Sequence, residues 1–99
     1  MKRSKELLNV VIGIIIDTEN KVLLNKRKKN TTLSGYWEFP GGKIKPNETL
    51  NQALSRELFE ELGIEIGNTD PLGSIEYQYS EHDVVLLPFR IIDYKGTPR

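Results

Sequence analysis

The chain has 99 residues, of which 28% are charged, and its 14 basic and 14 acidic residues give a formal net charge of zero. This length suits one domain spanning residues 1–99, and the neutral balance gives no global electrostatic reason to bind nucleic acid or an anionic membrane. The chain has no cysteine, which excludes disulfides and thiolate metal sites and fits a reducing cytoplasm.

The N-terminal segment has a basic start followed by an apolar run from Leu7 to Ile16. A signal peptide has a similar order, but this run contains Asn9, is rich in Val and Ile, and ends in polar residues 17–20 without a small-residue cleavage site. The run is also too short to span a bilayer. It therefore predicts a central strand that is covered on both faces of its sheet, with a turn after it.

The rest of the chain predicts several further strands around one helix. Residues 21–26 are expected to pair antiparallel with the first strand, residues 28–34 to form a polar loop, and residues 36–39 to form a short strand. Beyond the helix, the pattern predicts a loop at residues 65–71, strands at 72–79 and 84–94, and a hairpin turn at 80–83.

The helix is predicted from its two ends. Thr49 is a good N-cap, and Gln52 three residues later completes a capping box. Gly63 is suited to the residue that follows the last helical turn, because it accepts the left-handed conformation. At 3.6 residues per turn, one apolar stripe on this helix consists of Leu50, Leu54, Leu58 and Leu62.

Three carboxylates lie together on the edge of this helix beside the apolar stripe. Glu57 is three residues before Glu60 and four before Glu61, so the like charges repel one another unless a cation is bound. Oxygen ligands without cysteine or a second histidine favour Mg²⁺, with Mn²⁺ as the alternative, over zinc. A solvated acidic face is the other interpretation of such a charge run.

The stretch from Gly42 to Ile64 contains these glutamates in a longer pattern. The pattern is Gly42, five residues, Glu48, seven residues, Arg56-Glu57-Leu58, one residue, Glu60-Glu61, one residue, then Gly63-Ile64. It resembles the Nudix box, G-x5-E-x7-R-E-U-x-E-E-x-G-U with U a bulky aliphatic residue, and it fills every fixed position. The resemblance is to MutT-like nucleoside triphosphate pyrophosphohydrolases and covers nearly the whole chain.

The resemblance implies an α/β fold of the α+β type, in which a mixed sheet lies between helices. Such proteins continue past the last predicted strand into another strand and a C-terminal helix, and we expect these two elements to be missing here. One sheet face would then expose apolar side chains to water. We therefore expect either a homodimer that buries this face or a marginally stable fragment of a longer protein.

The resemblance also implies the roles of individual residues. It assigns metal ligation to the backbone carbonyl of Gly41 and to the carboxylates of Glu57, Glu60 and Glu61. It gives Glu48 and Arg56 a salt-bridging role that orients the carboxylates, although Arg56 can instead form an ordinary surface pair with Glu60. Glu57 is the candidate general base. The candidate catalytic residues are Glu48, Arg56, Glu57 and Glu60.

Three further residues are candidates for substrate binding. Arg27 follows a predicted strand, at the place where MutT-like enzymes contact phosphate; a solvated basic run is the alternative. Phe39 precedes the Pro-Gly-Gly turn and corresponds to a base-contacting position, but it would also suit the core. His82 is expected in a hairpin turn near the nucleobase, and a lone loop histidine is also often merely solvated.

These observations predict a Mg²⁺-dependent cytoplasmic hydrolase of a nucleoside diphosphate linked to another group. The first candidate reaction converts dGTP, 8-oxo-dGTP or another nucleoside triphosphate to the monophosphate and pyrophosphate, which would sanitise the nucleotide pool. A Nudix hydrolase of dinucleoside polyphosphates or nucleotide sugars is one alternative. A non-catalytic nucleotide- or metal-binding module is the other. The expected partner is a small-molecule nucleotide, not nucleic acid or a membrane.

Overall fold

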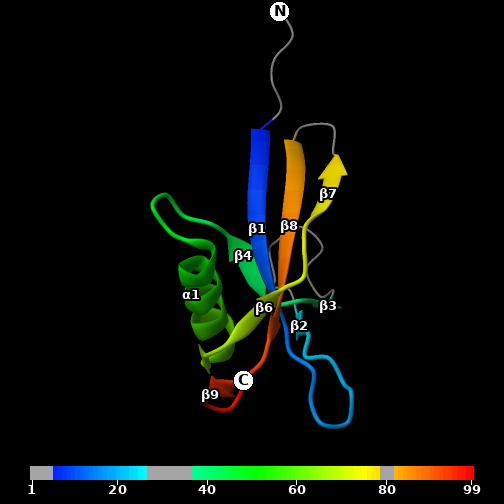
Figure 1. The fold of residues 1–99 in the computed structure, drawn as a ribbon, viewed down its shortest axis with the longest axis vertical. Helices are drawn as coiled ribbons and strands as arrows, with labels where there is room; N and C mark the ends of the chain where they lie inside the picture. Colours follow the sequence, from blue (N-terminus) through cyan, green and yellow to red (C-terminus); the bar gives the residue numbers. More distant parts are fainter. Residues whose placement is uncertain (1–5, 27–36, 79–81) are drawn as a thin grey trace, which may run out of the picture.

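The computed structural model describes residues 6–26, 37–78 and 82–99. Figure 1 shows helix α1 beside a sheet whose longest strands are β1 and β8. The elements are β1 (Glu6–Ile14), β2 (Asn25–Lys26), β3 (Trp37–Glu38), β4 (Gly41–Lys43), α1 (Leu50–Leu62), β5 (Glu65–Ile66), β6 (Thr69–Pro71), β7 (Ile75–Gln78), β8 (His82–Ile91) and β9 (Tyr94–Lys95). In these ranges, no helix has both the length and the apolar character needed to cross a membrane.

The main sheet is mixed, as the resemblance to Nudix hydrolases implied. Its strands follow the order β4-β1-β8-β6, and β7 also pairs with β8. β1 and β8 are parallel, with Val11 opposite Leu87, whereas β4, β6 and β7 are antiparallel to the strands that they join. β1 therefore lies in the interior of the sheet, and β4 is one edge of the sheet among the described strands.

The hydrophobic core lies between α1 and one face of this sheet. Val11 of β1 is fully buried, together with Leu54 and Leu58 of the helix. Burying one such leucine stabilises the fold by about 1.5–3 kcal/mol. Gly13 permits this close approach, because a Cβ atom there would lie only 2.8 Å from Cδ2 of Leu58. A larger residue at position 13 would therefore force the Leu58 side chain to shift.

The predicted apolar stripe of α1 is correct in three of its four positions. Leu54, Leu58 and Leu62 are buried, but Leu50 is 41% exposed. Ala53 is fully buried in the same core. Leu50 is the first residue of the helix, so the buried stripe begins later than the periodicity predicted.

Both predicted ends of the helix are confirmed. The Thr49 hydroxyl accepts a hydrogen bond from the Gln52 N–H at 3.1 Å, and the Gln52 side chain accepts one from the Thr49 N–H at 2.9 Å. Gly63 adopts a left-handed conformation with φ of 71°, and its N–H donates to the Phe59 carbonyl. These local contacts satisfy backbone groups that would otherwise lack partners at the helix ends.

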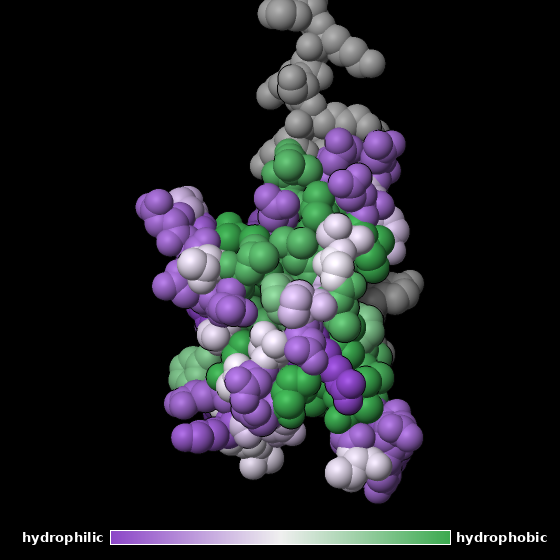
Figure 2. All heavy atoms as spheres, viewed as in Figure 1, coloured by the Kyte–Doolittle hydropathy of each residue, from purple (hydrophilic) through white to green (hydrophobic). Residues whose placement is uncertain are grey.

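The sheet face opposite α1 is less completely covered, so the expectation that β1 is buried on both faces is wrong. Val10 and Ile12 point to this face and are only half-buried. On neighbouring β7, Ile75 is 46% exposed and Tyr77 is 47% exposed. The reason is that, within the described residues, α1 is the only helix and it covers the other face. The face on which α1 lies is not fully covered either, because Figure 2, viewed from that side, shows apolar residues at the surface over parts of β1 and β8.

Two predicted connections differ from the structure. Residues 21–26 were expected to pair with the first strand, but the pairing is limited to one bridge between Ile16 and Val22, and β2 pairs with β3. The predicted loop at residues 65–71 contains β5 and β6, which pair with β9 and β8. Strands this short are stabilised by their partners and leave little pattern in their own sequence.

The predicted strands in the last third of the chain are shorter than expected. β7 begins at Ile75, and the strand expected to continue to Tyr94 ends at Ile91, followed by the separate strand β9. The predicted turn at residues 80–83 is also too long, because β8 already begins at His82. Residues 80 and 81, and the predicted loop at residues 28–34, lie outside the described residues.

Candidate active site

Arg56 on α1 is the centre of a network of charged hydrogen bonds. Its Nε donates to Oε2 of Glu48 at 2.7 Å, and its Nη2 donates to Oε1 of Glu48 at 2.9 Å. Its Nη1 donates to Oε1 of Glu57 at 2.7 Å, and Nη2 also reaches the carbonyl of Lys43 at 3.1 Å. The contact from Nη1 to Glu60 is longer, at 3.6 Å. Arg56 therefore links the loop before α1 to Glu57 and is more than a surface partner of Glu60.

Glu48 is held in place by its own loop as well as by Arg56. Its Oε1 accepts the Lys45 N–H at 2.8 Å, and Asn47 between them adopts a left-handed conformation with φ of 67°. The hydrogen bonds from Arg56, followed by the one from Lys45, lower the pKa of Glu48 from 4.5 to about 2. Bonds to Glu48 and then Glu57 raise the pKa of Arg56 above its ordinary value. Both residues are therefore charged at neutral pH.

Two of the three helix glutamates lie against the edge strand β4. The Glu61 carboxylate accepts the Gly41 N–H at 2.8 Å. The Glu57 carboxylate lies so close to Gly42 that a Cβ atom at position 42 would be 2.5 Å from Cδ of Glu57. Gly41 also has a φ of 154°, which side chains rarely adopt. The two glycines of the turn thus allow the strand backbone to reach the carboxylates.

The predicted metal ligands form an oxygen-only set that suits a hard divalent cation. In the described residues, however, no group of three acidic or histidine side chains is gathered closely enough to hold an ion. Glu57 is bound by Arg56, Glu61 by the Gly41 N–H, and the Glu60 side chain is 54% exposed. Ligation by all three would require at least one of these side chains to turn. The carboxylate oxygens of the glutamates, and the glycine backbone beside them, are nevertheless of the ligand type that such an ion binds.

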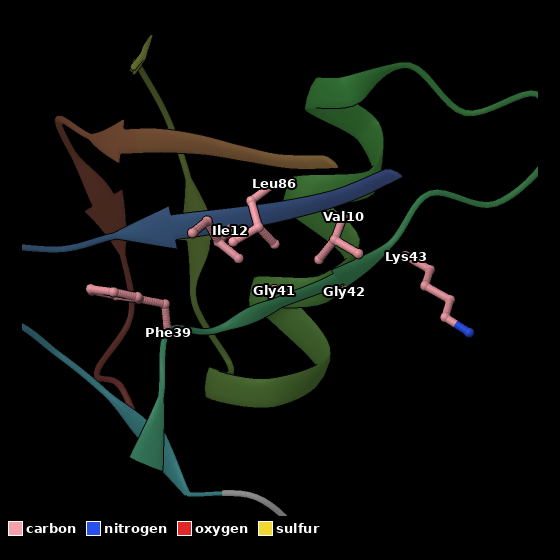
Figure 3. Close-up of a pocket in the computed structure, with 7 residues that line it drawn as sticks. All are labelled: Val10, Ile12, Phe39, Gly41, Gly42, Lys43 and Leu86. Atoms are coloured by element: carbon pink, nitrogen blue, oxygen red, sulfur yellow. The ribbon is translucent and has the colours of Figure 1, made fainter. Parts of the chain in front are cut away.

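A cavity of about 310 Å³ borders the same edge strand. Its volume lies at the lower end of the range typical of small-molecule pockets, about 300–1,000 Å³. Figure 3 shows its residues, which come from β1, β4, β8 and the turn before β4. The described residues that line it are Val10, Ile12, Phe39, Gly41, Gly42, Lys43 and Leu86. The cavity and the glutamates are therefore both adjacent to the Gly41–Gly42 backbone.

Only one of the three predicted substrate-binding residues lines the cavity. Phe39 lines the cavity and is 38% exposed, so it is not a core residue. Arg27 lies outside the described residues, and His82 is the first residue of β8. Sequence reasoning missed Val10, Ile12 and Leu86, whose apolar character indicated only a strand interior.

The Glu48→Gln variant should be less stable than the wild type at neutral pH, and this difference should shrink in acid. The folded-state pKa of about 2 lies below the ordinary value of 4.5. Ionised Glu48 therefore stabilises the folded state fully above pH 4.5, and that contribution is lost as pH falls toward 2. Urea unfolding of both proteins across this range measures the difference. A difference that stays constant with pH would contradict the assigned role of Glu48.

Comparison with known proteins identifies the family of this chain. The NUDIX domain model matches residues 7–97. The chain is 36% identical to an 8-oxo-dGTP diphosphatase from Proteus vulgaris, covering 93% of this chain and 82% of that protein. It is 39% identical to a CTP pyrophosphohydrolase from Escherichia coli, covering 89% of this chain and 64% of that protein.

A solved structure gives the same result at the level of the fold. The crystal structure of a MutT NUDIX hydrolase from Burkholderia pseudomallei superposes with a TM-score of 0.85 at 27% identity. The match covers 96% of this chain and 74% of that one. The Arg56 network and the glutamates beside β4 thus occur in a chain that matches the family along nearly its whole length. The chain belongs to the Nudix family, as a MutT-like Nudix hydrolase.

Proposed function

We propose that this chain hydrolyses nucleoside triphosphates to the monophosphate and pyrophosphate in a Mg²⁺-dependent reaction, with dGTP and 8-oxo-dGTP as the first candidates. The observation that carries the proposal is the position of β4 between the glutamates and the apolar cavity. A nucleotide lying across Gly41 and Gly42 would place its base in the cavity and its phosphates near Glu57. The name of the Proteus vulgaris relative supports the same substrate class. The biological role of this chain would then be to sanitise the nucleotide pool.

The proposed chemistry divides between a metal ion and the residues around it. Nudix hydrolases generally use divalent metal ions. Glu57, Glu60 and Glu61, with the Gly41 carbonyl, would hold a Mg²⁺ ion, which would activate water and offset phosphate charge. Glu57 accepts the proton of the attacking water. Arg56 orients the Glu57 carboxylate through the 2.7 Å hydrogen bond, as residues behind a metal site commonly do.

Other residues of the proposed site act on the substrate. Phe39 lines the cavity and would stack on the base. Arg27 is proposed to contact phosphate, and His82 to lie near the base. Glu48 acts indirectly, because its two hydrogen bonds with Arg56 fix the position of that side chain.

The products of the reaction test this proposal. With dGTP or 8-oxo-dGTP and Mg²⁺, chromatography should show a nucleoside monophosphate and pyrophosphate in equal amounts. This result is expected because water would cleave the bond between the α and β phosphates. Nucleoside diphosphate plus orthophosphate would contradict the assignment. Turnover of only dinucleoside polyphosphates or nucleotide sugars would shift the substrate class, and the absence of any hydrolysis would indicate a binding module.

We also propose that two copies associate in the cytoplasm through the β7 side of the sheet face opposite α1, beside the cavity at β4 and without covering it. Ile75 and Tyr77 of β7 are nearly half exposed on this face and supply apolar surface to bury. Size-exclusion chromatography with light scattering should give the mass of a dimer. Tyr77→Lys should shift the mass toward that of the monomer, because it places a charge in the interface. A sharp monomer peak for the wild type at micromolar concentration would rule out this dimer.

A further inference from the structure

The peptide group between Pro40 and Gly41 is held through both of its polar atoms. Its carbonyl, on Pro40, accepts the Gly13 N–H that follows from β1 at 2.8 Å. Its N–H, on Gly41, donates to Oε2 of Glu61 on α1 at 2.8 Å. Pro40 itself is fully buried. This one peptide group therefore connects an interior strand of the sheet to the helix, and its orientation is fixed from both sides.

Gly41 is closely confined between these two elements at the start of β4 (Figure 3). A Cβ atom at position 41 would overlap the carbonyl oxygen of Val11 and lie 2.8 Å from Cα of Ile12. The backbone of β1 therefore leaves no space for a side chain here. The hydrogen bond from the Gly41 N–H to Glu61 is partly buried, and a buried N–H that loses its acceptor is destabilising. Glu61 thus supplies an acceptor that this backbone position needs.

The pairing of β4 with β1 directs the polar groups of Gly41 away from β1. The Pro40 carbonyl accepts from Gly13 of β1, and residue 40 therefore faces that strand. The Ile44 N–H donates to the Asn9 carbonyl of β1 at 3.3 Å, so residue 44 does the same. Successive residues of an antiparallel strand alternate in this respect. The Gly41 carbonyl is therefore directed, like the Gly41 N–H, to the edge of β4 where the helix glutamates lie.

We propose that Glu61 is a positioning residue for the metal site, which holds the Gly41 N–H so that the Gly41 carbonyl faces the ion. This inference rests on the proposed function, because that function makes the carbonyl a metal ligand. A backbone ligand has no rotatable side chain, so its direction depends on how the neighbouring peptide groups are held. A carboxylate has two oxygens, and accepting the N–H through Oε2 is compatible with ligation through Oε1.

The first experiment measures the hydrogen bond itself in the metal-free protein, by hydrogen–deuterium exchange followed by NMR. Glu61→Ala should speed exchange of the Gly41 N–H by about 10- to 100-fold, as expected for losing a hydrogen bond to a charged group. Glu61→Gln should keep the slow exchange, because the glutamine oxygen also accepts. The Gly67 N–H, which donates to the Asp93 carbonyl, is the internal reference for an intact fold. Faster Gly41 exchange in both variants alike, or in neither, would overturn the inference.

The second experiment measures Mn²⁺ affinity by calorimetry. Glu61→Ala should bind Mn²⁺ more weakly than Glu61→Gln by about 10- to 100-fold, the loss typical when a residue that orients a metal ligand is removed. Both variants lack the charge, so the difference between them reports the hydrogen bond together with any ligation by the amide oxygen.

Glu60 supplies the matched control for this difference. It lies on the same helix, is also a proposed ligand, and has a side chain that is 54% exposed. Glu60→Gln and Glu60→Ala therefore measure the part of the difference that comes from ligation alone. Their Mn²⁺ affinities should differ much less than those of the two Glu61 variants. A difference at Glu61 no larger than the one at Glu60 would overturn the inference.

The outcomes separate this inference from the proposed function. Both expected variant patterns in a protein that binds Mn²⁺ but does not hydrolyse dGTP would leave the inference standing and contradict the proposed catalysis. Hydrolysis of dGTP, with equal Mn²⁺ affinities for Glu61→Gln and Glu61→Ala, would support the proposed catalysis and overturn the inference. A wild-type protein that binds no Mn²⁺ would overturn both.

Discussion

Hydrolysis of dGTP by the Glu57→Gln variant should be slower than by the wild type by at least about 10²-fold in kcat. Glutamine keeps the shape of the side chain beside Gly42 but lacks the negative charge that Arg56 binds and that the proposed proton transfer and metal ligation require. Steady-state rates under saturating Mg²⁺ and nucleotide measure the effect. Thermal unfolding of the same protein shows whether the variant is folded.

Two comparison variants make this result specific. Glu76→Gln removes an exposed charge from β7 and should leave kcat unchanged. Glu60→Gln should lower kcat by a similar factor to Glu57→Gln, although Glu60 is 54% exposed and lies 3.6 Å from Arg56. A loss at this position would point to metal ligation, since Glu60 has little part in the Arg56 network. If Glu60→Gln raised the melting temperature with full activity, the glutamates would be only a solvated acidic face.

Chelation of divalent ions with EDTA should abolish hydrolysis completely, and added Mg²⁺ or Mn²⁺ should restore it. The expectation follows from the three glutamates on one helix that are proposed as ligands and from the preference of hard cations for oxygen. The rate would be followed by released pyrophosphate during titration with each metal. Full activity in EDTA would contradict a metal-dependent mechanism. Activity restored by Zn²⁺ alone would contradict the oxygen-ligand argument.

Binding of the metal gives a readout that is independent of turnover. Calorimetric titration of the wild type with Mn²⁺ should show binding, and the Glu57→Gln variant should bind Mn²⁺ more weakly. The repulsion among the carboxylates should also be relieved by the ion. The melting temperature of the wild type should therefore rise with added Mn²⁺.

The sequence predicted α1 well because the information for it is local. Thr49, Gln52 and Gly63 act within a few residues of the helix ends, and their contacts are those expected from their types. The strands were harder to predict. β5 and β6 exist because β9 and β8 lie beside them, so residues 65–71 were predicted as a loop from their own composition.

The site was predictable to the extent that its residues follow one another along the chain. Arg56 contacts Glu48 and Glu57 at 2.7 Å, and all three residues belong to the one sequence motif that was recognised. The cavity combines β1, β4 and β8, so its lining could be recognised only once the strands were paired. For the same reason Val10 and Leu86 were predicted as strand residues without a further role.

The parallel pairing of β1 with β8 has a consequence for how this chain folds. The partners Val11 and Leu87 lie near opposite ends of the sequence, so the central ladder closes a very long loop. Contacts of such large sequence separation slow folding, because the chain entropy is lost before the contacts form. During synthesis, β1 leaves the ribosome long before β8 exists. We expect β1 of the nascent chain to lack its β8 partner until β8 emerges, and the chain to depend on chaperones in that interval.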